Sequence, residues 1–150
     1  MKFLKYILLL LLAGFIVLQF FGIEKTNPEF DASKDLITIT KPPAKVAQML
    51  RSACYDCHSN ETIWPWYSNI APVSWMLEEH VTDGRDNLNF SFWGEFDAED
   101  RIYVLEEMIE EIELGNMPIP GYLITHSDAK LSESEQELFI EWIRSQQTLD

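Results

Sequence analysis

Cys54-Tyr55-Asp56-Cys57-His58 is the stretch around which the rest of the chain is organised. Its two cysteines are the only ones in 150 residues, so they serve each other or one shared cofactor. A spacing of three residues on a helical turn places both thiols on one side, where they can meet two vinyl groups on one porphyrin edge. His58 follows at once and can reach the iron as its proximal ligand. The motif therefore predicts one haem c, attached covalently through Cys54 and Cys57.

Two other kinds of site also place cysteines at this spacing, a redox-active dithiol and a zinc site. A thioredoxin-type dithiol lies where a strand meets a helix, and no βαβ pattern surrounds Cys54 and Cys57. A closed zinc site needs four ligands, whereas only three cluster here and His80 lies well along the next predicted helix. Haem attachment is the interpretation that uses both cysteines and His58.

The second axial position on the iron can be filled by methionine, by histidine or by no side chain. The candidates are Met49, Met76, Met108, Met117, His80 and His126. We favour Met117 because it follows the helix-ending Gly115 in an irregular segment that Pro118 and Pro120 stiffen. His126 is the alternative. Methionine opposite histidine raises the reduction potential and favours electron transfer, whereas an open position allows a small ligand or peroxide to bind.

The N-terminus carries an apolar run from Tyr6 to Ile23, preceded by Lys2 and Lys5. A removable signal peptide and a retained signal anchor both explain this pattern. We favour the anchor because bulky residues stand where a cleavage site needs small ones. Residues 1–23 are therefore expected to form a transmembrane helix, which would make the protein a single-pass inner-membrane protein with its C-terminal domain in the periplasm.

The net charge of the chain limits the classes of partner that can be expected. It has 25 acidic residues against 11 basic ones, a formal net charge of −14. Nucleic acid is excluded as an expected partner because its phosphates would be repelled. The expected partners are the membrane, through the N-terminal helix, and a periplasmic redox protein.

Hydrophobic positions repeat with helical period and few segments alternate, so the predicted class is all-α. Residues 24–42 indicate a tether, with at most a short extended piece at 36–40, and the haem-binding domain is expected at 43–150. Helices are expected from Ala44 to the cysteines, from Pro72 to Gly84, from Asp97 to Gly115, and onward from a capping box at Ser132. The predicted buried faces of the last two helices are Ile102, Leu105, Met108, Ile109 and Ile112, then Leu138, Phe139, Trp142 and Ile143.

Residues 43–146 also resemble a known family, the haem-binding domain of exported proteins from Bacteroidetes and related bacteria, which is similar to class I cytochrome c. The residues that carry the resemblance are Cys54–Thr62, Trp64–Trp75, Gly84-Arg85, Leu88–Ser91, Trp93, Met117-Pro118, Tyr122, His126 and Leu131-Ser132. The resemblance implies a cytochrome c-like helical domain around one haem. It places attachment on Cys54 and Cys57, proximal ligation on His58 and distal ligation on Met117.

These observations predict a membrane-anchored periplasmic monohaem c-type cytochrome that transfers electrons. It is not expected to be an enzyme, because no separate set of acid, base and nucleophile stands out. The alternative is a haem-based small-ligand sensor or peroxidase-like module with an open or labile distal position. Five aromatic residues are candidates either for the haem pocket or for the core: Trp64, Trp66, Tyr67, Trp75 and Trp93.

Overall fold

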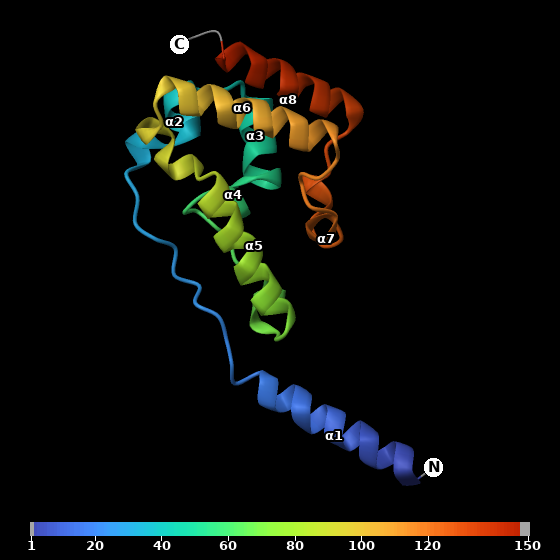
Figure 1. Ribbon diagram of the computed structural model, residues 1–150. Coiled ribbons are helices and arrows are strands. Elements are labelled where there is room, and N and C mark those ends of the chain that lie inside the picture. Colours follow the sequence, from blue (N-terminus) through green and yellow to red (C-terminus); the bar gives the residue numbers. More distant parts are fainter. Residues whose placement is uncertain (1, 148–150) are drawn as a thin grey trace.

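The computed structural model describes residues 2–147, and within that range it contains helices and no strand, which confirms the predicted all-α class (Figure 1). The α-helices are α1 (Lys2–Leu18), α2 (Leu36–Thr40), α3 (Ala44–Ala53), α4 (Tyr55–His58), α5 (Val73–Asn87), α6 (Ala98–Glu113), α7 (Pro120–Leu123) and α8 (Glu133–Gln146). Short 3₁₀ helices are η1 (Ala32–Lys34), η2 (Trp66–Asn69), η3 (Phe90–Glu95) and η4 (Ser127–Ala129). Residue 1 of the predicted anchor and residues 148–150 of the predicted domain lie outside the described residues.

The N-terminal helix is shorter than the apolar run that predicted it. α1 has 17 residues, which rise about 26 Å, less than the roughly 30 Å of a hydrocarbon core. Just after it, the Gln19 side chain donates to the Ala71 carbonyl at 3.0 Å and accepts from the Ala71 N–H at 3.1 Å. Across residues 2–147, no helix is both long and apolar enough to span a membrane. The predictions of an N-terminal transmembrane helix and of single-pass inner-membrane anchoring are therefore wrong.

The segment between α1 and α3 is bonded to the rest of the molecule. The Asn27 side chain donates to the Thr62 carbonyl at 2.9 Å, and Leu36 is fully buried. Residues 36–40 form the helix α2, so the extended piece predicted there is wrong. The reason is a cap: the Asp35 carboxylate accepts from the N–H groups of Ile37 and Thr38 and satisfies the free end of the helix. The predicted start of the haem-binding domain at residue 43 stays a prediction.

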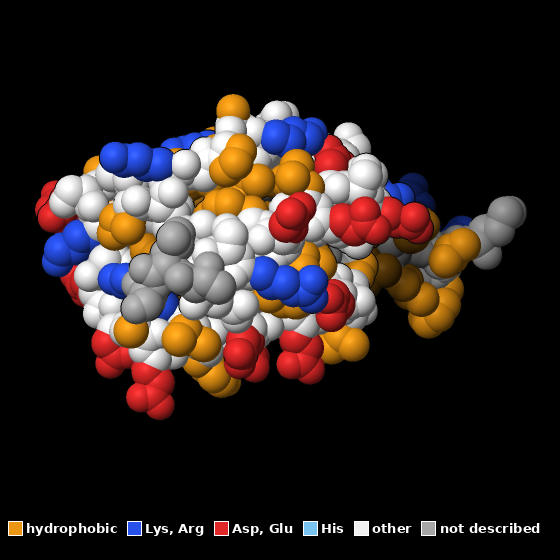
Figure 2. Space-filling model, turned by 90° about the horizontal axis from the view of Figure 1, so that it is seen from above, with side chains coloured by type: hydrophobic (Ala, Val, Ile, Leu, Met, Phe, Trp, Pro, Cys, Tyr) orange, Lys and Arg blue, Asp and Glu red, His pale blue; other side chains and the backbone are white. Residues whose placement is uncertain are grey.

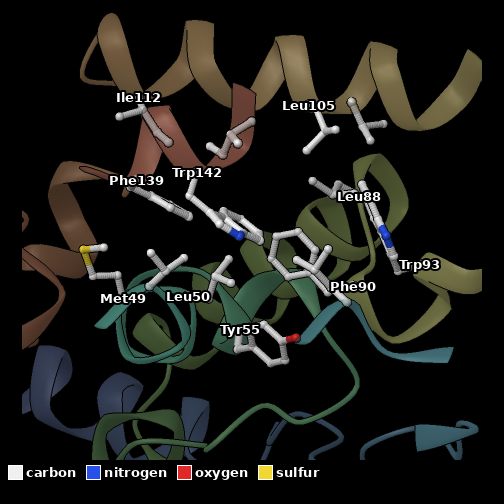
Figure 3. Packing of buried hydrophobic residues seen from close by; sticks show 14 of the residues in the cluster. Met49, Leu50, Tyr55, Leu88, Phe90, Trp93, Leu105, Ile112, Phe139 and Trp142 are labelled. Atoms are coloured by element: carbon white, nitrogen blue, oxygen red, sulfur yellow. The ribbon is translucent and has the colours of Figure 1, made fainter. Parts of the chain in front are cut away.

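The core lies where α6 and α8, side by side in Figure 1, cover α3, α4 and η3. Figure 3 shows the rings of Trp142 and Phe90 meeting at its centre, with Leu105 of α6 on one side and Tyr55 on the other. Phe139 stacks on Trp142 with ring centroids 5.9 Å apart. The cluster comprises Leu36, Val46, Met49, Leu50, Tyr55, Leu88, Phe90, Trp93, Val104, Leu105, Ile112, Leu131, Phe139, Trp142 and Ile143.

Most predicted helix ends and faces agree with the structure. Asp97 caps α6 and the Ser132 capping box opens α8, as predicted. Two residues of the predicted buried faces, Ile102 and Leu138, are instead 38% and 40% exposed. Val104 is buried in place of Ile102, because the packed stripe of α6 is rotated from the predicted one.

Candidate functional site

A cavity of about 520 Å³ opens between α4, α5, α6 and the segment that leads into α7. Cys54, Cys57, His58 and Met117, the four residues predicted to hold a haem, all line it. The first three come from one helical turn, whereas Met117 comes much later in the sequence, after α6. The fold therefore brings all four predicted site residues to one place.

The attachment motif adopts the predicted helical turn. α3 ends at Ala53, and the N–H of His58 donates to the Cys54 carbonyl at 2.9 Å, which closes the turn of α4. Thr62 and Arg85 fix the end of this turn from outside. The Thr62 hydroxyl donates to the Asp56 carbonyl at 2.7 Å, and the Arg85 guanidinium donates to the Ser59 carbonyl at 2.8 Å and to the Thr62 hydroxyl at 2.9 Å. Arg85 thus links α5 to the end of the motif.

The two thiols are in an environment that keeps them protonated. Burial raises the pKa of Cys54 to about 12 and, together with the charge of Asp56, raises the pKa of Cys57 to about 11. A redox-active dithiol needs a thiolate, which a lowered pKa provides. In the described part of the chain, no group of three or more His, Cys, Asp or Glu side chains could hold a metal ion. The dithiol and zinc interpretations therefore gain no support from the structure.

His58 is oriented as a metal-binding histidine would be. Its Nδ1 lies 3.0 Å from the Leu88 carbonyl, which can only accept, so Nδ1 carries the proton and Nε2 keeps its lone pair. Burial lowers the pKa of His58, so the ring is neutral near pH 7. The Phe90 ring packs 5.9 Å from the imidazole. The nitrogen left over for iron is thus Nε2.

The Leu88 carbonyl is itself held in place by a network that the sequence analysis missed. The N–H of Leu88 donates to the Gly84 carbonyl at 2.9 Å, which ends α5. Beyond it, the Asn89 side chain donates to the Asn60 side chain at 2.9 Å, and the Asn60 N–H donates to the Ser91 hydroxyl at 2.9 Å. Residues just after the attachment motif and just after α5 therefore fix each other. In the sequence, the only signal for this network was the polar residues themselves, around Asn60 and Asn89.

Gly84 has a role different from the predicted one. The sequence indicated a helix end, but α5 continues to Asn87 and Gly84 is buried within it. A Cβ at Gly84 would lie 2.7 Å from the carbonyl oxygen of Cys57. Glycine is needed here because the backbones of α5 and α4 approach closely. This contact seats the second cysteine against α5.

The distal side of the cavity is formed by Met117, Pro118, Ile119 and Tyr122. Met117 is 36% exposed and lies at the cavity rim. Among the other methionines and histidines proposed as ligands, Met108 and His80 also line the cavity, whereas Met49, Met76 and His126 do not. His126 instead stacks flat on Tyr122, with ring centroids 3.9 Å apart and planes at 7°.

None of the five aromatic residues considered for the haem pocket lines the cavity within residues 2–147. Trp93 belongs to the core and Trp66 is 72% exposed. The aromatic residues that do line the cavity are Phe90, Tyr103, Tyr122 and Phe139. Sequence patterns could not separate these two sets, because whether an aromatic side chain faces the cavity depends on how the helices pack.

The chemistry of the lining fits a haem. Apolar side chains, among them Leu88, Val104 and Ile112, surround the two thiols and the imidazole, as a large and mostly apolar ring requires. Cys54 and Cys57 would hold the haem and His58 would bind its iron. Acidic residues also line the cavity: Asp56, Asp83, Glu107 and Glu111.

A family model described as a haem-binding domain matches residues 13–145. The match includes the attachment motif, α5, α6 and the Met117 segment, which is residues 114–119 between α6 and α7. Neither the curated proteins nor the solved structures include one that matches the chain. The expected similarity to class I cytochrome c is therefore not shown and stays a prediction.

Proposed function

The chain belongs to the haem-binding domain family, and from this premise we propose that it is a monohaem c-type cytochrome that transfers electrons. The observation that carries the proposal is the convergence of Cys54, Cys57, His58 and Met117 on one cavity. In this proposal Cys54 and Cys57 form the covalent links and His58 Nε2 is the proximal ligand. Met117 is the distal ligand.

The bound haem would supply a one-electron redox centre. The protein residues would set its properties. The Leu88 carbonyl that holds His58 Nδ1 would increase the basicity of the proximal ligand, and a Met117 thioether bound to the iron would favour a high reduction potential. The apolar part of the lining would limit water in the cavity. Together these features suit reversible electron transfer.

The proposed partner is a redox protein with a basic docking surface. Figure 2 shows acidic side chains projecting along the lower edge and at the right of one face of the molecule, with Lys and Arg side chains elsewhere on the same face. The cavity lining contributes Asp83, Glu107 and Glu111, and the net charge of the chain is −14. A basic partner would be attracted to this acidic surface, and the attraction would weaken as salt is added.

A small-ligand sensor or peroxidase-like module is the second candidate function. The observation that favours it is the position of Met117 at the rim, 36% exposed, where the side chain can leave the cavity without disturbing the core. In that case the distal position would be open or would open on reduction.

Covalent attachment is tested by replacing both cysteines. Cys54→Ser/Cys57→Ser, made in a host that attaches c-type haem, is expected to lose all haem that survives denaturing electrophoresis. His80→Gln is the matched control, because His80 lines the same cavity but takes no part in the proposed covalent attachment, and it should keep its haem. Covalent haem retained by the double-serine protein would refute attachment at this motif.

The distal assignment is tested with carbon monoxide, which binds reduced haem only where the distal position is free. The reduced wild-type protein should bind it at least about tenfold more slowly than Met117→Ala. Equal rates would refute methionine ligation and favour the small-ligand function. Met76→Ala is the matched control and should behave as the wild type, because Met76 is exposed and does not line the cavity.

A further inference from the structure

We propose that the hydrogen bond between Tyr122 and Asp56 positions the Met117 segment over the attachment helix and keeps Met117 on the iron. The inference rests on the proposed function, since it concerns how the proposed distal ligand is held. It assigns a role to Asp56, a residue inside the attachment motif that attachment itself does not use.

The Met117 segment is tied to the molecule at both ends. At its start, the N–H groups of Asn116 and Met117 donate to the Glu111 carbonyl at 3.0 and 3.1 Å, so the segment begins at the end of α6. Pro118 follows and has no N–H to donate. The backbone of Met117 is thus fixed at the α6 end, and the direction that its side chain takes into the cavity also depends on what holds α7, at the other end of the segment.

Tyr122 is the residue of α7 that reaches the attachment helix. Its ring is 9% exposed, and its hydroxyl donates to the Asp56 carboxylate at 2.8 Å and lies 3.3 Å from the Ser52 carbonyl. The contact joins α7 directly to α4 and α3. Hydrogen bonds to a carboxylate are about twice as strong as those between neutral groups.

Asp56 is prepared for this contact by a second bond. Its Oδ1 accepts from the N–H of Ile63 at 2.9 Å, which leaves Oδ2 facing Tyr122. The carboxylate thus joins three segments: the attachment turn, the loop after it and α7. An alanine or serine at this position would leave the cysteine spacing unchanged and would lose both bonds.

The Tyr122 ring is supported from its other side. His126 stacks on it at 3.9 Å, and the His126 Nδ1 lies 3.1 Å from the Tyr122 carbonyl. The Tyr67 ring meets His126 edge-on at 6.0 Å. His126, considered above as an iron ligand, is therefore a positioning residue for Tyr122.

The test compares Tyr122→Phe, Asp56→Ala and the double variant, each as the haem-loaded full chain. Tyr122→Phe keeps the stacked ring and removes only the hydroxyl, while Asp56→Ala removes the carboxylate and with it also the bond from the Ile63 N–H. Asp86→Asn is the matched control, because Asp86 is an exposed carboxylate of α5 that does not line the cavity. Two quantities are measured: the rate of carbon monoxide binding to the reduced protein, and amide hydrogen exchange over residues 117–126.

Each single variant should bind carbon monoxide about tenfold faster than the wild type and exchange faster over 117–126. The double variant should match Asp56→Ala, since all three variants break the same contact. Asp86→Asn should change neither quantity. If a variant carries less haem, both quantities are measured on the fraction that carries haem, and these values are compared with the wild type.

The outcomes separate this inference from the proposed function. Suppose that the wild type binds carbon monoxide slowly and Met117→Ala binds it fast, but Tyr122→Phe binds it as slowly as the wild type and shows unchanged hydrogen exchange. The positioning role is then refuted, while methionine ligation stands. If the wild type binds as fast as Met117→Ala, methionine ligation fails. Exchange that is nevertheless faster in Tyr122→Phe would then show that the contact holds the segment without serving a methionine ligand, and this too overturns the proposal as stated.

Discussion

The two sides of the cavity are built differently. The attachment side, residues 54–62 and 84–91, is buried or half-buried except at Asp86 and Asn87. Arg85 and the Asn60 N–H donate hydrogen bonds within it, and the Leu88 carbonyl accepts one from His58. The distal side, residues 114–126, carries the 36% exposed Met117 and the 84% exposed Ile124. It meets the attachment side chiefly through the Tyr122 hydroxyl. If the proposed function holds, binding the haem and supplying its sixth ligand would be controlled by separate parts of this fold.

This division has a physical basis. A covalently held cofactor needs its two thiols and its imidazole in one fixed arrangement, which dense packing and satisfied polar groups provide. For a distal ligand that can bind or leave, the free-energy difference between the bound and the released position is small. A few contacts are therefore enough to decide its position. Substitutions on the attachment side should therefore affect stability strongly, and matched ones on the distal side weakly.

The largest expected difference is between two large apolar residues. Phe90→Ala removes a ring that is 1% exposed and packs on Tyr55 at 5.3 Å and on His58 at 5.9 Å. It should lower the free energy of unfolding by about 3–5 kcal/mol, measured by urea unfolding of the haem-loaded protein. Ile124→Ala on the distal side should change it by less than about 0.5 kcal/mol. Similar losses for both would contradict the comparison.

The next difference concerns two glycines. Gly84→Ala puts a methyl group 2.7 Å from the Cys57 carbonyl oxygen, and the resulting shift of α5 should cost about 1–3 kcal/mol. Gly121→Ala in α7 adds a methyl group with nothing within 4 Å and should be near neutral. Thermal unfolding of the two haem-loaded variants measures both. Unchanged stability in Gly84→Ala would show that α5 does not need its close approach to Cys57.

The smallest expected difference is between two serines. Ser91→Ala removes the hydroxyl that accepts from the buried Asn60 N–H, and the unpaired donor should cost about 1–2 kcal/mol. Ser127→Ala changes an exposed residue directly after the distal side and should have an effect within about 0.5 kcal/mol. Urea unfolding of both variants, followed by circular dichroism, provides the measurement. If Ser91→Ala left the free energy of unfolding unchanged, the hydrogen bond from Asn60 would not be one of the contacts that stabilise the attachment side.

Local patterns predicted much of the fold and the identity of the site. Asp97 and Ser132 cap helices through neighbours three residues away, so their roles follow from sequence alone. The apolar run at the N-terminus was misleading, because hydropathy does not show that the helix ends at Leu18, where Gln19 then bonds to Ala71. Gly84 was misread for a related reason: a glycine marks a helix end or a close approach, and the partner that decides between them is far away in sequence.

By itself, the sequence determined the attachment turn, the helical class and the candidate ligands, because these depend on residue types at fixed short spacings. Only the tertiary structure decided that Met117 and His58 line one cavity while His126 lies on Tyr122. It also decided that His58 presents Nε2, since the carbonyl that takes its proton belongs to Leu88, thirty residues away. Contacts between distant segments depend on how helices pack, and no local pattern records that packing.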